Sequence, residues 1–257
     1  MPRFAANLSM MFQEHAFEDR FAAAAAAGFG AVEFLFPYAV PADRLAQRLQ
    51  AAGLEQVLFN LPPGDWDKGE RGLGCLPGRE ADFRAALETA IGYAKALNCP
   101  RLHAMAGLVA PHDKAACTET WVGNLRHAAT RAEAENLTIV LEALNTRDVP
   151  GYLYNRQSEV VRIIERVGSL RLKLQFDLYH CQIMEGDLAT HIRELFPFIG
   201  HVQVAGVPGR QEPDIGEINY PYLFELLDSL GYSGWIGCEY RPRGRTEDGL
   251  AWLKPWR

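Results

Sequence analysis

The chain has 257 residues, of which 48% are hydrophobic and 23% are charged. This is the composition of an ordinary folded protein, and it excludes intrinsic disorder as the main state. Lysine and arginine total 26 against 32 for aspartate and glutamate, so the formal net charge is −6. A general binder of nucleic acid or of anionic membranes carries the opposite sign, so we expect neither partner.

Cysteine usage and the N-terminal sequence bear on the compartment. The five cysteines are widely spaced and form no CxxC pair, so they predict neither a disulfide framework nor a zinc ribbon. The first residues, MPRFAANLSMMFQEH, lack the basic and apolar regions of a signal peptide, and no later segment has the ~18 apolar residues of a membrane span. We therefore expect a cytoplasmic protein without a membrane segment.

Strand-like and helix-like segments alternate along the whole chain. The first strand is followed by a helix that contains six consecutive alanines and stops at Gly28, a residue typical of helix ends. The predicted strands cover residues 4–7, 31–35, 55–60, 101–105, 138–142, 172–177, 201–205 and 235–239. The predicted helices cover residues 17–27, 41–52, 80–97, 114–135, 159–167 with Ser158 as its N-cap, 187–195 and 220–230.

Eight strands, seven of them followed by a helix, predict an α/β protein folded as one closed (β/α)₈ barrel, the TIM-barrel architecture. No linker, charge block or low-complexity segment divides the chain, so residues 1–257 are expected to form a single domain. A doubly wound open sheet is the alternative, although it usually has fewer strands. The longest irregular segment, residues 61–79, follows the third strand at the active-site end of such a barrel, so we expect it to be functional.

The last four predicted strands carry an oxygen-bearing side chain at or near their carboxyl ends. These residues are Glu142, Asp177, Gln203 and Glu239, each about one βα repeat from the next. In a barrel, the ends of these strands meet at one mouth. Polar residues often follow strands because turns are polar, but four successive strands ending in this way indicate a site. Three carboxylates and an amide carbonyl are hard ligands that suit Mg²⁺ or Mn²⁺ and suit zinc poorly.

Three histidines lie on or near these strands. His180 follows Asp177 by three residues, so its imidazole is expected on the first turn beyond the rim, where it could bind a substrate hydroxyl or carboxylate. His201 shares its strand face with Gln203 but lies deeper, so we interpret it as a core histidine. His103, at the fourth strand, fits either role.

Two arginines on loops could hold a substrate carboxylate through paired hydrogen bonds. Arg210 lies on the loop after the seventh strand, and Arg71 lies in the segment 61–79. Trp66, Phe12 and Tyr240 could wall the pocket and exclude water, although ordinary packing explains them equally well. The glycine-rich segments match neither GxGxxG nor GxxxxGKS, so nucleotide binding has no support.

Six segments, in order along essentially the whole chain, resemble the hydroxypyruvate isomerases of the xylose-isomerase-like barrel superfamily. They are RFAANLSMMF, VEFLFPY, LPPGDWDKGERGLGCLPGRE, FDLYHCQIMEGDL, HVQVAGVPGRQEPDIGEINYPYLF and GWIGCEYRPRGRTEDGL. The resemblance implies a divalent-metal site made by Glu142, Asp177, Gln203 and Glu239. It also implies that Glu142 and Glu239 act as the proton donor and acceptor.

The implied reaction interconverts hydroxypyruvate and 2-hydroxy-3-oxopropanoate (tartronate semialdehyde) by proton transfer through a metal-stabilised cis-enediolate. The alternative is the related 2-oxo-tetronate isomerase group, which acts on a four-carbon oxo sugar acid and is similar in its N-terminal, C-terminal and EPDIGEINYP segments. The segments GDWDKGERG, DVPGY and DLYHCQIMEGDL look more like hydroxypyruvate isomerase. Related sugar epimerases commonly have histidine where this chain has Gln203, so their substrate preferences are not carried over.

Other classes of protein fit the sequence less well than an isomerase of a small oxo acid. A metal-dependent DNA-repair nuclease can use this barrel, but it needs several histidine ligands and a basic groove, whereas this chain has 7 histidines and a net charge of −6. A non-catalytic binding barrel is expected to lack at least one rim carboxylate, and none is missing. We expect exposed aromatic clusters at Tyr220–Tyr222 and Trp252–Trp256, which could bury in a homo-oligomer such as a dimer.

Overall fold

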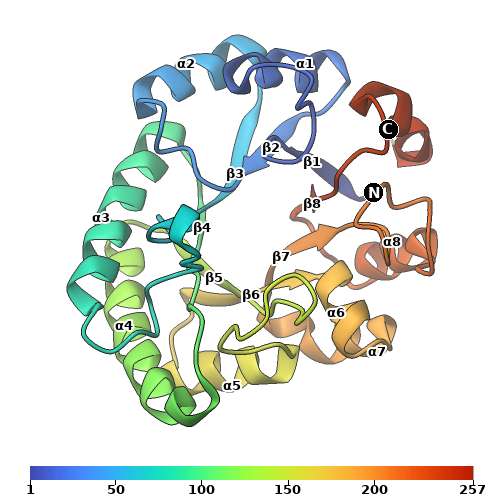
Figure 1. Ribbon diagram of the computed structural model, residues 1–257. Coiled ribbons are helices and arrows are strands. Elements are labelled where there is room, and N and C mark those ends of the chain that lie inside the picture. The colour runs from blue at the N-terminus through green and yellow to red at the C-terminus, as the bar shows by residue number, and fades with distance from the viewer. Residues whose placement is uncertain (257) are drawn as a thin grey trace.

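Short, largely buried segments form the strands of a closed barrel in the computed structural model, which describes residues 1–256. Each strand pairs in parallel with its neighbours in sequence order, and β8 pairs with β1 to close the ring (Figure 1). The predicted α/β barrel is therefore confirmed, and the open-sheet alternative is wrong. The strands are β1 Arg3–Asn7, β2 Ala31–Phe34, β3 Glu55–Asn60, β4 Arg101–His103, β5 Thr138–Glu142, β6 Leu172–Asp177, β7 Ile199–Val204 and β8 Trp235–Cys238.

The helices surround the barrel on the outside (Figure 1). They are α1 Arg20–Ala26, α2 Ala42–Ala52, α3 Glu80–Leu97, α4 Lys114–Ala134, α5 Gln157–Val167, α6 Leu178–Met184, α7 Leu188–Leu195 and α8 Tyr220–Ser229. Five 3₁₀ segments, η1 to η5, cover Phe17–Asp19, Trp66–Lys68, Pro111–Asp113, Phe196–Phe198 and Thr246–Trp256 within the described residues. The buried side chains of α3 include Phe83, Leu87 and Ile91, which recur every four residues and so form one apolar face.

Three local features differ from the sequence prediction. Ser158 is not the N-cap of α5, because the helix already begins at Gln157 and Arg156 occupies the cap position. The sequence pattern does not predict α6, which follows Asp177 without a loop and is capped by that carboxylate, since Asp177 Oδ1 accepts the Tyr179 N–H at 2.7 Å. It also does not predict η5, whose Trp252 packs edge-on against Phe4 of β1 with ring centroids 5.1 Å apart.

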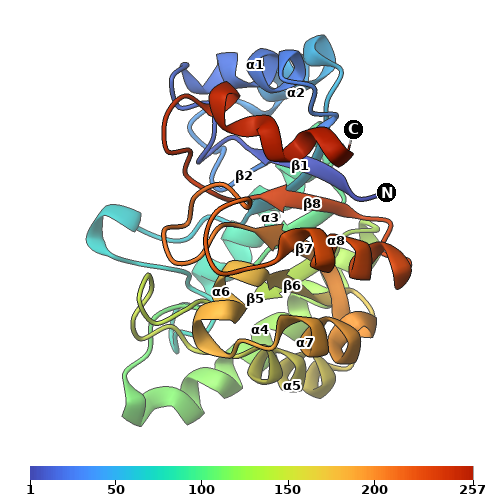
Figure 2. The same cartoon turned by 90° about the vertical axis from the view of Figure 1, so that its right-hand side faces the viewer.

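The loops that follow the strands lie together on one side of the barrel. Figure 2 shows the loops after β3, β5 and β7 on this side, away from the N-terminus, with the segment 61–79 (cyan) extending beyond the others. Most strands carry buried polar residues. One more buried polar residue, Glu239, comes directly after β8. Together, these residues include Asn7, Glu33, His103, Glu142, Gln175, Asp177, His201, Gln203 and Glu239. Because buried polar groups need partners, this set marks where the barrel differs from an ordinary apolar core.

The aromatic clusters that were candidates for an oligomer interface belong largely to the core of the chain itself. Tyr220 and Trp252 are buried. The Tyr220 hydroxyl donates to the Ala205 carbonyl at 2.7 Å, and the Trp252 ring N–H donates to the Tyr240 hydroxyl at 3.3 Å. Tyr222 is 46% exposed. The expected exposure is therefore wrong for Tyr220 and Trp252, because α8 and η5 pack these rings against neighbouring elements.

Membrane insertion finds no support in the helices. Among residues 1–256, none of the helices has both the length and the apolar character that crossing a bilayer requires.

Candidate metal and substrate site

Closure of the barrel brings the predicted ligands together at the carboxyl rim. Glu142 is the last residue of β5 and Asp177 the last of β6, while Glu239 comes directly after β8. A carboxylate oxygen from each of these three residues and a ring nitrogen of His180 all lie within 4.8 Å of one another. The structure therefore gathers three of the four predicted ligands into one cluster and adds His180 to it.

Gln203, the fourth predicted ligand, is paired in register with Asp177 across β6 and β7. Its amide nitrogen donates to Glu33 Oε1 at 2.8 Å, and its carbonyl oxygen accepts a hydrogen bond from Gln175 Nε2 at 2.6 Å. A carbonyl oxygen has two lone pairs, so one acceptor position of Gln203 is not used by Gln175.

The donor set fits a divalent cation. Glu142 Oε1 and Asp177 Oδ2 are buried and have no hydrogen-bond partner among the described residues. Buried carboxylate oxygens are costly unless hydrogen bonds or positive charge compensate them. Oxygen ligands of this kind are those that Mg²⁺ and Mn²⁺ prefer. The unpaired oxygens therefore indicate a place where a cation would be stabilised.

Burial and mutual repulsion oppose ionisation of the cluster. Burial, with the neighbouring Glu239 and Asp177 carboxylates, raises the pKa of Glu142 well above its usual value. Burial also raises the pKa of Glu239 to about 8 and that of Asp177 to about 6, in both cases against the lowering effect of Arg210. A cation in the cluster would favour the ionised carboxylates, because opposite charge lowers a carboxyl pKa.

Arg210 brings positive charge to the cluster from the loop after β7. Its guanidinium donates to Glu239 Oε2 at 2.7 Å and lies 4.0 Å from Asp177 Oδ2. Burial lowers the pKa of Arg210, but the surrounding carboxylates outweigh this effect and raise it above its usual value. Arg210 Nε is buried without a partner among the described residues. The guanidinium therefore stays charged and retains one donor for a further acceptor.

His180 lies in the first turn of α6, as its spacing from Asp177 predicts. Its Nδ1 accepts the Asn145 backbone N–H at 3.0 Å. Burial, and then Arg210, lowers the pKa of His180 well below its usual value, so the ring is neutral and its proton lies on Nε2. Nε2 lies 3.6 Å from Asp177 Oδ2 and 3.9 Å from Glu142 Oε1. An Arg210 nitrogen also lies 3.5 Å from Nε2, and in this tautomer Nε2 can donate a hydrogen bond to an oxygen at the site.

Two further polar residues face the site. His103, at the end of β4, lies with Nδ1 3.8 Å from Glu142 Oε2, and neither of its ring nitrogens has a hydrogen-bond partner among residues 1–256. Burial lowers the pKa of His103 to about 3, so the ring is neutral. Sequence reasoning missed Asp148, whose Oδ2 accepts a hydrogen bond from Asn145 Nδ2 at 3.1 Å and lies 3.4 Å from an Arg210 nitrogen. In the sequence, the feature that could have indicated Asp148 is its position as an acidic residue on the loop after β5.

These side chains line a cavity of about 500 Å³ at the rim. Its lining includes His103, Glu142, Asp148, Tyr179, His180, Arg210 and Glu239, together with Trp66 and Arg71 from the segment 61–79. The Arg71 guanidinium lies over the Trp66 ring, 3.7 Å from its centroid, and donates to the Trp66 carbonyl at 3.0 Å. The long loop therefore contributes an aromatic ring and a cation to the wall.

Phe12 and Tyr240 do not line this cavity. Both are buried in the apolar core, where Phe12 packs edge-on against Phe29 and Tyr240 against Trp252, with ring centroids 6.2 Å and 6.3 Å apart. Their candidate role as pocket walls is wrong, and ordinary packing explains them. His201 is a core histidine as expected, with Nε2 2.7 Å from Glu33 Oε2.

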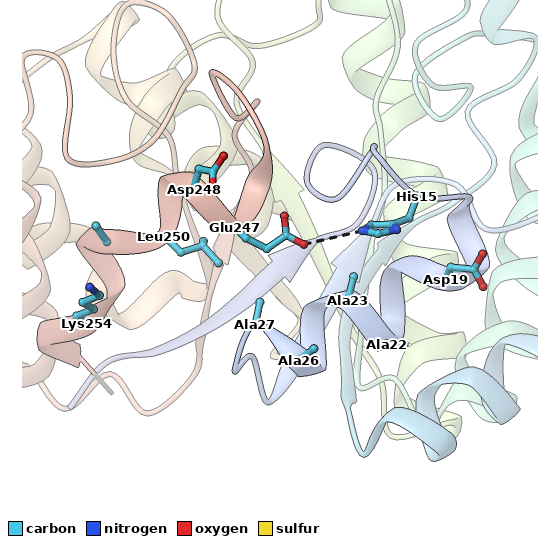
Figure 3. Close-up of a pocket in the computed structure, with 11 residues that line it drawn as sticks. His15, Asp19, Ala22, Ala23, Ala26, Ala27, Glu247, Asp248, Leu250 and Lys254 are labelled. Carbon is cyan, nitrogen blue, oxygen red and sulfur yellow. Dashed lines mark ion pairs between the residues drawn. The ribbon is translucent and has the colours of Figure 1, made fainter.

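A larger hollow, about 800 Å³, lies outside the barrel between α1 and η5 (Figure 3). Alanines of α1 line one wall, and His15 Nε2 faces Glu247 Oε1 at 3.9 Å. None of its lining residues comes from the carboxyl end of a strand. Because active sites of this fold lie at those strand ends, the smaller rim cavity is the candidate functional site.

Comparisons with known proteins first identify the class to which the fold belongs. The family model described as xylose isomerase-like TIM barrel matches residues 21–256. A solved structure described as AP endonuclease, family 2, from Brucella melitensis has a TM-score of 0.99 and 53% sequence identity, with 100% of both chains covered.

Curated relatives then narrow the class to a family. A 2-oxo-tetronate isomerase of Cupriavidus necator is 60% identical over 257 residues, which cover 100% of this chain and 99% of the relative. A hydroxypyruvate isomerase of Escherichia coli K12 is 43% identical over 258 residues, which cover 100% of both chains. The chain belongs to the family of sugar-acid isomerases that comprises hydroxypyruvate isomerase and 2-oxo-tetronate isomerase.

Proposed function

We propose that the protein is a metal-dependent 2-oxo-tetronate isomerase, which moves the carbonyl group of a four-carbon oxo sugar acid between C2 and C3. The observation that favours this substrate is the relative from Cupriavidus necator, which is 60% identical along the whole chain and is described by this activity. The buried acidic cluster at the barrel rim supports the chemistry, because the reaction needs acid and base groups held against adjacent carbons.

Glu142, Asp177, Gln203 and Glu239 would hold the divalent cation, Mg²⁺ or Mn²⁺. The unpaired oxygens of Glu142 and Asp177 and the free acceptor position of Gln203 support this ligand set. When bound, such a cation supplies Lewis-acid stabilisation of negative charge on adjacent substrate oxygens.

Glu142 and Glu239 would carry the proton between the two carbons. One carboxylate removes the hydrogen from the carbon next to the ketone, and a carboxylic acid returns a proton to the former carbonyl carbon, with an enediolate between the two steps. Both side chains are buried and line the rim cavity. Without a cation, burial raises the pKa of Glu239 to about 8, and a bound cation would lower it, so this group can take up and release a proton near neutral pH.

His180, Arg210 and Arg71 would bind the substrate. The Nε2–H of His180 is directed to the acidic cluster and can donate to a substrate oxygen. Arg210 and Arg71 line the same cavity and can hold the substrate carboxylate, since a guanidinium presents paired donors.

Hydroxypyruvate is the second candidate substrate. The 43% identical relative from Escherichia coli is a hydroxypyruvate isomerase, and the segments GDWDKGERG and DVPGY resemble that group. The two substrates differ beyond C3, where the four-carbon acid carries one more hydroxymethyl group. The same acid and base residues would serve both.

The first experiment is proton NMR of each oxo acid incubated with the purified protein in D₂O, with Mg²⁺ and with EDTA in parallel. We expect metal-dependent conversion of the 2-oxo-tetronate with deuterium incorporated at carbon, and a kcat/KM at least about tenfold above that for hydroxypyruvate. A higher kcat/KM for hydroxypyruvate would assign the three-carbon substrate instead. Absence of conversion and exchange with both acids, alongside cleavage of a duplex containing an abasic site, would replace the isomerase by a nuclease.

A further inference from the structure

Beside the three carboxylates of the cluster lies a further buried carboxylate that is not part of it. Glu33 is the third residue of β2, and its side chain is fully buried. Its Oε1 accepts hydrogen bonds from Asn7 Nδ2 at 3.0 Å and from Gln203 Nε2 at 2.8 Å. Its Oε2 lies 2.7 Å from His201 Nε2. A buried carboxylate is costly unless it is hydrogen-bonded, and Glu33 has three partners on two strands, Asn7 on β1 and both Gln203 and His201 on β7.

Strand β8 leaves room for this carboxylate at Gly237. A Cβ at Gly237 would come within 2.5 Å of both Cδ and Oε1 of Glu33. Gly237 is paired in register with Gln203 of β7. It also lies two residues before Glu239, and residues two apart along a strand face the same side, so Gly237 and Glu239 face the same side of the barrel wall. The glycine therefore lets a side chain from β2 reach across to the metal ligand on β7.

The chemistry of Glu33 determines the orientation of the Gln203 amide. Glu33 Oε1 already accepts a hydrogen bond from Asn7 Nδ2, so this oxygen acts as an acceptor and the nitrogen of Gln203 must face it. The carbonyl oxygen of Gln203 then points away from Glu33, where it accepts from Gln175 Nε2 and keeps one lone pair. Without this acceptor the amide could turn, and an N–H₂ group in place of the oxygen cannot ligate a cation.

We propose that Glu33 is a positioning residue for the metal site, because its hydrogen bond to Gln203 fixes the carbonyl oxygen of that side chain as a ligand. The inference rests on the metal site of the proposed function. Glu33 acts through Gln203, and it is assigned no contact with the cation or the substrate.

The test measures Mn²⁺ affinity by calorimetry on the full chain without substrate. Glu33→Leu removes both acceptor oxygens, so the Gln203 amide loses the oxygen to which it donates. We expect the Kd for Mn²⁺ to rise roughly 10–100-fold, the range seen when a residue that orients a metal ligand is changed. In a Gln203→Ala background, the same Glu33→Leu change should raise Kd by less than about threefold, because the group it positions is absent.

A second variant keeps the Glu33 carboxylate and displaces it. Gly237→Ala places a methyl group against that carboxylate and should also raise Kd, so the proposal stays testable if Glu33→Leu does not fold. Gly123→Ala is the matched control, because a Cβ there meets nothing within 4 Å. Thermal unfolding of each metal-free variant reports its folding.

Each result bears on the proposal separately from the proposed function. A wild-type chain that binds Mn²⁺, with a Glu33→Leu variant that binds equally well, would overturn the role of Glu33 alone. An undiminished effect of Glu33→Leu in the Gln203→Ala background would also overturn it, because Glu33 would then not act through Gln203. Failure of the wild-type chain to bind Mn²⁺ or Mg²⁺ would overturn both the metal site and the inference.

Discussion

Glu239 accepts hydrogen bonds from two nitrogen donors, one charged and one neutral. Arg210 donates to Oε2 at 2.7 Å from a charged group, whereas Asn7 Nδ2 lies 3.4 Å from Oε1 and is neutral. Burial nevertheless raises the pKa of Glu239 to about 8, so desolvation outweighs the guanidinium. A carboxyl group in this balance changes its protonation state in response to small changes nearby, as a proton-transfer group must.

Glu239→Gln should abolish proton transfer while preserving the fold. The amide is isosteric but cannot accept and return a proton, so we expect kcat to fall by about 10²–10⁴-fold, the usual contribution of general acid or base catalysis. The exposed Glu165→Gln is the matched control and should leave kcat unchanged. Steady-state kinetics and thermal unfolding of both variants test this, and a Glu239→Gln variant with wild-type turnover would refute the assignment.

Arg210→Lys should weaken substrate binding and leave the fold intact. Lysine keeps the charge beside Glu239 but loses the planar pair of donors that a carboxylate accepts. Loss of one charged hydrogen bond corresponds to a rise in KM of about tenfold or more. The KM for the favoured oxo acid is the measurement, with Arg241→Lys, on the exposed side of the same cavity, for comparison. An unchanged KM would remove Arg210 from the substrate site.

At the scale of single residues, the sequence predicts the rim carboxylates well and the residues that orient them poorly. Glu142 and Asp177 end apolar runs, so their positions follow from the strand pattern. Glu33 also interrupts an apolar run, but its hydrogen bonds join it to strands that are distant in sequence. Such contacts depend on barrel register, which no local pattern contains.

At the scale of elements, the segment 61–79 is held against the barrel by its own glycines. Gly72 has a φ of +115°, its N–H donates to the Pro63 carbonyl at 2.9 Å, and a Cβ there would come within 2.5 Å of the Met105 carbonyl oxygen. Asn124 of α4 donates to the Gly74 carbonyl at 2.8 Å. These contacts fix the backbone that carries Arg71 into the cavity.

Gly72→Ala should therefore lower activity by displacing the loop. We expect kcat/KM to fall about tenfold, because the added methyl group forces the backbone next to Arg71 away from Met105. Gly78→Ala is the matched control, since Gly78 lies in the same loop with a φ of +84° but has nothing within 4 Å of the added Cβ. Both changes carry the strain of a left-handed backbone, of about 1–3 kcal/mol. Equal losses of kcat/KM in the two variants would show that strain, and not loop position, is responsible.

Element boundaries show where the sequence pattern stops being sufficient. Strands β5 and β6 have the predicted limits, because each apolar run ends at a carboxylate. Strand β4 ends at His103 although the apolar run continues to Met105, and β8 ends at Cys238. At these ends the pairing partner, rather than propensity, decides where the ladder stops. Helix α6 follows its strand without a turn signal, so no local rule separates the two.

At the scale of the whole molecule, barrel closure was predictable and substrate length was not. Eight alternating units specify which ends of the strands meet, so four residues far apart in sequence could be assigned to one site. The difference between a three-carbon and a four-carbon acid is one hydroxymethyl group. Its recognition depends on the walls of a cavity of about 500 Å³, to which residues of several loops contribute. Fold and strand ends therefore indicate the chemistry, while the loops decide the substrate.

The acidic cluster also links the stability of the whole barrel to pH and to metal. Burial raises the pKa of Asp177 to about 6 and that of Glu239 to about 8, so between about pH 4 and pH 8 the folded protein holds protons that the unfolded chain releases. This contribution to stability is fully present below the unfolded pKa values and is lost as the pH rises through the folded ones. The metal-free protein should therefore lose stability across this interval.

Excess Mg²⁺ should reverse this trend. The cation binds the ionised carboxylates and competes with protons, so it should stabilise the folded state more at pH 8 than at pH 6. The measurement is the thermal unfolding midpoint from pH 5 to pH 9, with EDTA and with Mg²⁺, and we expect the difference between the two curves to widen as the pH rises. Curves that stay parallel would show that proton and metal do not share these carboxylates. Asp177→Asn, which removes one of them, should narrow the difference at pH 8 and thereby tie it to the rim.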